Sequence, residues 1–110
     1  MAVDEHDKNE LELYLENTGE LYEDKKKIIG AMIRRMERGA LKDPASLWLP
    51  WVTKGATRYR REIGTDTSFP LELRSELAKD LAEKYAEGIR RHEYAWVIED
   101  GERRLKERMT

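Results

Sequence analysis

The sequence predicts an all-α fold: a small bundle of three main helices, plus a short N-terminal helix and a short charged C-terminal segment. Apolar residues recur every three or four positions through most of the chain, whereas the alternation typical of strands is nearly absent. Residues typical of helix ends separate these periodic stretches. A length of 110 residues suits a single core, so residues 1–110 are expected to form one helical domain.

The N-terminal helix is predicted to be short. Residues 9–12, NELE, place an asparagine three positions before a glutamate, a pattern typical of a helix start. Its apolar face comprises Leu11, Tyr14 and Leu15. The preceding residues 1–8 are expected to form a mobile acidic arm. Asn-Thr-Gly at 17–19 interrupts the helix while the apolar phase continues, which fits either a new helix capped by Thr18 or one kinked helix.

Three main helices are expected near residues 19–38, 44–63 and 70–98. Gly39 suits the position just after the first of them, because glycine readily adopts the left-handed backbone found there. Asp43 and Pro44 suit the N-cap and first position of the second helix, and Gly64 suits its end. Pro50 removes one backbone hydrogen bond inside that helix, so a kink or a restart is expected nearby.

The third main helix is expected to begin directly after the polar loop TDTSF at residues 65–69. An Asp-Gly pair ends its apolar pattern, and residues 101–110 are expected to form a charged, frayed tail. His92 falls within the apolar stripe, where a hydrogen-bonded core histidine is the expected role. Arg74 lies on the same face, so its guanidinium needs a partner at the end of the preceding helix, such as Glu62 or a free carbonyl.

The core is predicted from the apolar residues on the inner faces of the three main helices. They are Ile29, Met32, Ile33, Met36, Trp51, Val52, Tyr59, Ile63, Leu77, Leu81 and Tyr85. At about 100° per residue, Trp48 and Trp51 point toward this core rather than outward as a platform on which bases stack.

The net charge of −2 hides a strong segregation along the chain. Residues 1–24 carry nine acidic side chains and one basic, and residues 25–61 carry eleven basic side chains and two acidic. Residues 62–110 carry twelve acidic and nine basic side chains, so the net charges of the three parts are −8, +9 and −3. The acidic part is expected either to lie against the basic part or to leave it free for an anionic partner.

Six basic residues are predicted to form an outward stripe on two helices: Lys27, Arg34, Arg38, Lys54, Arg58 and Arg61. Such a stripe is either a solvated face or a surface that binds the phosphates of DNA or RNA. Six of the eleven basic residues in 25–61 are arginine, whose planar fork suits phosphate. Acidic residues do not alternate with them at a spacing of four, as they do in helices stabilised by ion pairs, which favours the binding surface. The absence of any common nucleic-acid-binding motif favours the solvated face.

No catalytic pattern is evident, so we expect a protein that is not an enzyme. His6 and His92 have no partner at a spacing typical of metal ligands, and no metal site is expected. Neither a glycine-rich phosphate loop nor a nucleophile motif occurs, and no cofactor is expected. The chain has no cysteine and no apolar run of about 18 residues, so a cytoplasmic protein that binds no membrane is expected.

Self-association is expected at the far end of the third main helix. Its apolar residues there point to several faces, which one bundle does not readily cover: Tyr94, Trp96, Val97 and Ile98. A homodimer through these residues is therefore expected, since twofold pairing is the commonest way to cover such a patch. The alternative is that residues 102–108 fold back over it.

A loose pattern of residues runs through roughly residues 12–85, and it comprises Leu21, Tyr22, Gly39, Asp43, Gly55, Ala56, Arg58, Tyr59, Glu62, Gly64, Phe69 and Arg74. In this order the residues resemble a loose group of short uncharacterised all-helical proteins that phages and other mobile elements encode. The chain departs from the pattern of that group at Pro50. The resemblance implies a small accessory protein of a mobile element in a bacterial host cell, and it implies no catalytic residue.

Two hypotheses on function remain open. The first is a non-catalytic accessory protein that binds nucleic acid or another polyanion through the basic face of residues 25–61. The alternative is a protein-binding inhibitor or modulator of a host complex, which acts through acidic and apolar surfaces.

Overall fold

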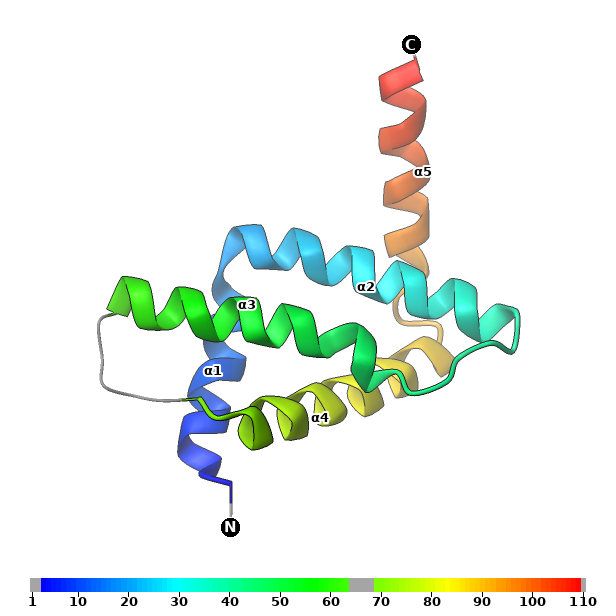
Figure 1. Ribbon diagram of the computed structural model, residues 1–110. Coiled ribbons are helices and arrows are strands. Elements are labelled where there is room, and N and C mark those ends of the chain that lie inside the picture. Colours follow the sequence, from blue (N-terminus) through cyan, green and yellow to red (C-terminus); the bar gives the residue numbers. More distant parts are fainter. Residues whose placement is uncertain (1–2, 64–68, 110) are drawn as a thin grey trace.

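The computed structural model describes residues 3–63 and 69–109, with the side chains at positions 104, 105, 108 and 109 excepted. Within these residues the fold is all-α, as predicted, and no strand occurs. The helices in chain order are α1 (Glu5–Asn17), α2 (Gly19–Glu37), α3 (Ala45–Ile63), α4 (Leu71–Arg90) and α5 (Ala95–Met109) (Figure 1). Gly64, the predicted end of the second main helix, and residues 65–68 of the predicted polar loop lie outside this description.

The bundle is built from three long helices and closed at one end by a shorter one. α2 and α3 run side by side in opposite directions, and α4 passes below them and packs mainly on α3 (Figure 1). α1 lies across one end and contacts α2, α3 and α4. α5 packs its beginning on α2 and then rises away from the bundle. The core therefore lies between the first four helices.

Aromatic rings from two helices meet at the centre of the core. Trp48 of α3 is fully buried and stacks on Tyr85 of α4, with ring centroids 4.8 Å apart. Trp51 meets Trp48 edge-on at 5.4 Å and donates its indole N–H to the carbonyl of Leu21 at 2.9 Å. The indole N–H of Trp48 donates to the sulfur of Met32 at 3.1 Å. Both tryptophans point into the core, as predicted, and each joins α3 to α2.

Most of the predicted core is buried. The confirmed residues are Ile29, Met32, Trp51, Val52, Tyr59, Leu77, Leu81 and Tyr85. Ile33 and Met36 are only half-buried, and Ile63, the last residue of α3, is 49% exposed, so its predicted place in the core was wrong. The core also contains residues absent from the predicted set: Leu11, Leu15, Leu21, Phe69, Leu73 and Val97.

α1 begins earlier than predicted. The side chain of Asp4 accepts a hydrogen bond from the backbone N–H of Asp7 at 3.2 Å, so Asp4 rather than Asn9 caps the helix. Residues 5–8, which were expected in a mobile arm, belong to α1. The Lys8 ammonium, 12% exposed, contacts two carboxylates of α4 at 2.9 and 3.2 Å, which ties the start of α1 to the bundle.

α1 and α2 are separate helices, the first of the two predicted alternatives. Thr18 between them has extended backbone, with φ −100° and ψ 116°. Its hydroxyl donates to the carbonyl of Tyr14 at 2.7 Å, and the side-chain amide of Asn17 donates to the carbonyl of Leu13 at 2.8 Å. The Thr18 side chain therefore satisfies a carbonyl at the end of α1 and not an amide at the start of α2.

The connection between α2 and α3 was only partly predicted. Gly39 ends α2 as expected, with φ 65° and its N–H bonded to the carbonyl of Met36 at 3.1 Å. Asp43 has φ 41°, which differs from the extended backbone typical of an N-cap, and its carbonyl accepts the N–H and hydroxyl of Ser46. α3 continues through Pro50 without a restart. Pro50 is exposed, so water can reach the carbonyl that lacks its usual partner.

The single helix predicted at 70–98 is in fact two helices. At the end of α4, His92 takes φ 61°, and the N–H groups of His92 and Glu93 bond back to the carbonyls of Ile89 and Gly88, each at 3.0 Å. This pair of hydrogen bonds is a Schellman motif, which ends a helix by placing one residue in the left-handed backbone conformation. The turn leaves His92 exposed, so its predicted core role was wrong.

α5 occupies residues that were predicted partly as the end of a helix and partly as a frayed tail. It runs through Gly101, the expected break, as far as Met109. Apart from its chain neighbours and the nearby backbone of α5 itself, no described atom would lie within 4 Å of a side-chain carbon added at Gly101. Glycine here weakens an exposed helix without ending it.

Arg74 has hydrogen-bond partners, as its position required, but they do not lie at the predicted place, the end of α3. Its Nε donates to the carbonyl of Phe69 at 3.0 Å, and its Nη1 donates to the hydroxyl of Thr53 at 3.0 Å. Glu62, the other candidate, instead accepts the hydroxyl of Tyr14 at 2.7 Å. Arg74 therefore joins α4 to the segment before it and to α3.

Helices α1 and α3 approach closely where Gly55 faces Leu15. A side-chain carbon added at Gly55 would clash with the Leu15 side chain, coming within 3.0 Å of its Cγ. Leu15 is fully buried, so shifting its side chain would disturb the packed core around it. The contact therefore requires glycine on α3 at this point.

We predict that Gly55→Ala lowers the free energy of unfolding by about 1–3 kcal/mol, because overpacking outweighs the better helix propensity of alanine. Gly101→Ala is the matched control, since no described side chain lies within 4 Å of the added carbon, and a gain of up to about 1 kcal/mol is expected there. Urea unfolding followed by circular dichroism measures both. Equal stabilisation by the two substitutions would contradict the close approach.

A polar network crosses the edge of the core at Glu16 of α1. Its carboxylate accepts hydrogen bonds from the ammonium of Lys25 at 2.6 Å and from the hydroxyl of Tyr85 at 2.7 Å. Partial burial raises the pKa of Glu16, but the hydrogen bonds from Lys25 and Tyr85 outweigh it and place the pKa below its usual value. Burial and the hydrogen bond to Glu16 raise the pKa of Tyr85. The network joins α1, α2 and α4.

We predict that Glu16→Gln destabilises the protein by about 1–2 kcal/mol at neutral pH, because the hydrogen bonds lose their charged acceptor. A lowered carboxyl pKa stabilises the fold above the ordinary value of about 4.3, and this contribution disappears as the pH falls through the folded-state pKa. The difference in unfolding free energy between the wild type and the variant should therefore shrink in acid. A difference that is constant between neutral and acid pH would exclude the charged network.

Candidate nucleic-acid interface

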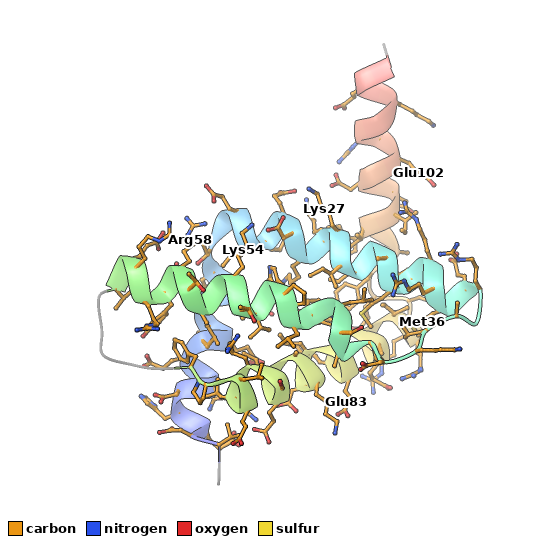
Figure 2. The ribbon with its side chains drawn as sticks, viewed as in Figure 1. Lys27, Met36, Lys54, Arg58, Glu83 and Glu102 are labelled. Atoms are coloured by element: carbon orange, nitrogen blue, oxygen red, sulfur yellow. The ribbon has the colours of Figure 1, made fainter. Side chains whose placement is uncertain are left out.

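The six predicted interface residues lie on two adjacent helices. Lys27 and Arg34 belong to α2, Arg38 is the C-cap residue directly after it, and Lys54, Arg58 and Arg61 belong to α3. Figure 2 shows Lys27, Lys54 and Arg58 on the side of the bundle away from α4. The two sets differ in their contacts, and this difference decides which of them is available to an anion.

The three residues on α2 form one line of exposed positive charge. Lys27, Arg34 and Arg38 are seven and four positions apart, so they follow one face of the helix over about 16 Å. All three are exposed, and none has an ion-pair partner among the described residues. The opposite face of α2 carries the buried Ile29 and Met32, which fixes the outward direction of the line. We call these three residues the α2 basic face.

On α3, in contrast, two of the three residues are already paired. The ammonium of Lys54 lies 2.8 Å from Asp24 of α2. Arg58 contacts Glu62 at 2.8 Å and Glu20 at 2.7 Å, and these hydrogen bonds raise its pKa further. Arg58 and Glu62 are four positions apart, so the predicted absence of such pairs was wrong here.

The acidic N-terminal part of the chain lies against part of the basic middle, as one of the predicted alternatives had it. Besides the pairs on α3, Lys25 lies 2.6 Å from Glu16, and Lys26 lies 3.1 Å from Glu23. Most of these partners come from different helices, so their spacing in the sequence could not reveal them. Arg61 remains exposed at the far end of α3.

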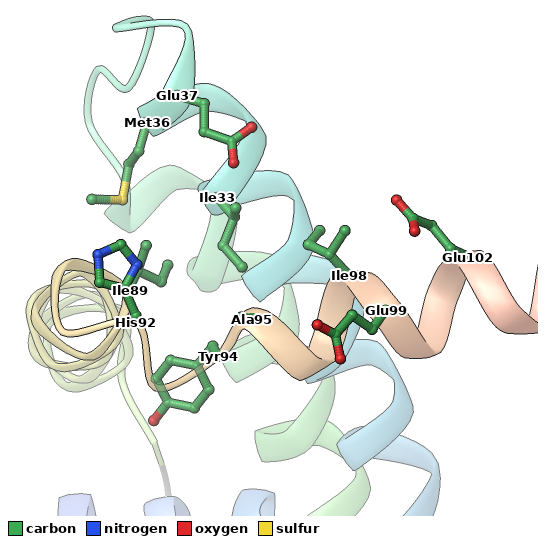
Figure 3. Close-up of a pocket in the computed structure, with 10 residues that line it drawn as sticks. All are labelled: Ile33, Met36, Glu37, Ile89, His92, Tyr94, Ala95, Ile98, Glu99 and Glu102. Atoms are coloured by element: carbon green, nitrogen blue, oxygen red, sulfur yellow. The ribbon is translucent and has the colours of Figure 1, made fainter.

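A groove of about 370 Å³ opens where α2, the end of α4 and the start of α5 meet (Figure 3). Apolar side chains line it, and three glutamates stand on its walls. The lining residues are Ile33, Met36, Glu37, Ile89, His92, Tyr94, Ala95, Ile98, Glu99 and Glu102. We call this feature the α2–α5 groove. The sequence did not predict it, because it forms only when the turn after α4 brings α5 back against α2.

The four residues predicted for self-association are mostly used within the chain. Tyr94 packs on the ring of Tyr85, with centroids 5.5 Å apart, and Val97 is buried. Ile98 is half-buried in the α2–α5 groove, whereas Trp96 is 44% exposed. The turn after α4 explains the difference, since a straight helix would have left these side chains beyond the bundle. Residues 102–108 do not fold back over the patch but continue α5 away from it (Figure 1).

Other site chemistry is sparse in the part of the chain that the structure describes. No group of three or more His, Asp or Glu side chains is placed to hold a metal ion there. His6 is exposed and lies 3.5 Å from Glu10, and His92 lies at the mouth of the α2–α5 groove. None of the described helices is long and apolar enough to cross a membrane.

No protein-family model, curated protein sequence or solved structure matches this chain. The geometry of the α2 basic face and of the α2–α5 groove is therefore the basis for assigning a function.

Proposed function

We propose that this chain is a non-catalytic accessory protein of a phage or other mobile element, which acts in the cytoplasm of a bacterial host. We further propose that it binds nucleic acid or another polyanion through the α2 basic face. The observation that carries the proposal is the line of three exposed cations on one helix, none of them paired within the described residues. The resemblance to proteins of mobile elements supports the biological setting.

Unpaired cations matter because an anion can bind them without displacing a carboxylate. Lys54 and Arg58 each contact carboxylates of the same chain, which a phosphate would have to replace. The α2 basic face has no such competitor among the described residues. Two of its three members are arginines, whose planar guanidinium can form two parallel hydrogen bonds with one phosphate.

The proposed contacts are with phosphates, so they select a charged backbone rather than a base sequence. Binding should weaken steeply with salt, because each phosphate contact releases condensed counterions. Trp48 and Trp51 are buried in the core and take no part in base stacking. DNA and RNA are therefore compared directly in the test.

We predict that Lys27→Glu, Arg34→Glu and Arg38→Glu together lower the affinity for a labelled oligonucleotide at least about tenfold at low salt. Because about three phosphate contacts are lost, the slope of log K against log salt concentration should become less negative by about 2.7 for duplex DNA. Fluorescence anisotropy with single-stranded DNA, duplex DNA and RNA measures both quantities.

The matched control reverses three exposed cations of α4: Lys79, Lys84 and Arg90. It changes the net charge by the same amount but leaves the α2 basic face intact, so the affinity should stay within a few-fold of the wild type. Circular dichroism checks that both variants keep their helices. An equal loss in the two variants would show that only net charge matters and would refute the assignment to α2.

A second candidate function, inhibition or modulation of a host protein complex, is favoured by the α2–α5 groove with its apolar lining and glutamate walls. Isolation of the protein from host lysate with and without nuclease distinguishes the two candidates. Partners that survive nuclease favour the second candidate, and partners lost with nuclease favour the first.

A further inference from the structure

α5 is only half supported by the bundle. Its first turns are anchored on α2, where Val97 is buried and Ile98 lies against Gly30, at 3.8 Å from the position of a Gly30 side-chain carbon. The Lys26 ammonium adds a contact to Asp100 at 3.4 Å. Beyond this point the helix points away from the other four (Figure 1).

A helix that projects from the bundle in this way is a weak structure in water. α5 has 15 residues, close to the length at which isolated helices are marginal, and its middle contains Gly101. Helices of this length are usually stabilised by packing rather than by propensity. The second half of α5 would therefore be stabilised by packing against another molecule.

The α2–α5 groove lies at the root of this same helix. Its floor includes Ile33, Met36 and Ile98, and the carboxylates of Glu37, Glu99 and Glu102 surround it (Figure 3). None of the three carboxylates has an ion-pair partner among the described residues. An apolar floor between unpaired acids fits a helix with apolar and basic side chains and disfavours an acidic one.

The chain itself carries such a helix. The first half of α5 contains Glu99, Asp100 and Glu102, whereas the sequence of its last seven residues, RRLKERM, has four basic residues and one acidic. Arg103 and Lys106 are exposed there. The contact of Arg103 with Asp100 at 2.7 Å is a surface ion pair, which exchanges easily for another carboxylate.

We propose that the α2–α5 groove binds the second half of α5 from a second copy of this chain. The two α5 helices run antiparallel, so the basic half of each lies in the acidic groove of the other. One twofold axis produces both contacts at once, and the assembly closes as a dimer. This surface is separate from the α2 basic face, so dimer formation can be tested independently of polyanion binding.

The test uses two charge-reversed variants of the full chain. The groove variant carries Glu99→Lys and Glu102→Lys, and the helix variant carries Arg103→Glu and Lys106→Glu. Sedimentation velocity and light scattering at tens of micromolar give the mass of each variant and of an equimolar mixture.

The wild type should have the mass of a dimer. Each variant alone should be a monomer, because its groove and the helix meant to occupy it then carry charge of the same sign. The mixture should recover the dimer mass, because the reversed groove of one variant then faces the reversed helix of the other, and both native partners also meet. A misfolded variant would not be rescued in this way.

A wild-type monomer at this concentration would overturn the proposal, and so would a mixture that remains monomeric. A synthetic basic amphipathic peptide, added to the wild type, tests the other possible occupant of the groove, a helix of a different protein. Binding of that peptide to a monomeric wild type would assign the groove to a foreign partner helix and refute the second copy. Competition between the peptide and dimer formation would support the second copy.

Discussion

Tyr85 lies where the parts of the bundle meet, with its ring stacked face to face on the indole of Trp48 at 4.8 Å. Its hydroxyl donates to Glu16 of α1, and the ammonium of Lys25 from α2 lies 5.6 Å from its ring centroid. The ring of Tyr94, just before α5, packs against it as well. One side chain of α4 thus fixes the positions of α1, α2, α3 and the turn into α5. Because these contacts are packed and partly buried, a change in one helix is transmitted to the others.

This packing determines which charges remain available at the surface. Docking the start of α2 against α3 brings acidic residues beside Lys54 and Arg58 and pairs both cations within the chain. Lys27, Arg34 and Arg38 form no ion pair with a carboxylate among the described residues, and they stay exposed. The groove glutamates arise in the same way, because the turn after α4 places α5 beside α2 with like charges on both walls.

Local patterns predicted the helices well, while features set by distant contacts were predicted poorly. The apolar spacing identified most core residues, and Gly39 marked a helix end because glycine is the usual residue there. The end of α4 was missed because His92 takes the same left-handed backbone without being glycine. The partners of Arg58 were missed in part because Glu20 is 38 positions away in the sequence. The groove followed neither from spacing nor from composition, since it depends on that missed turn.

The net charge of −2 says little about whether this chain attracts a polyanion. Exposed charges separated by more than about 8 Å are largely screened from one another at physiological salt, so a phosphate responds to the charges closest to it. The α2 basic face extends over about 16 Å, roughly two such lengths. The acidic groove lies on a neighbouring flank of the same helix, where Glu37 directly precedes Arg38 in the sequence. Two surfaces of opposite sign on one helical bundle can therefore select different partners, provided that each partner contacts its surface at short range.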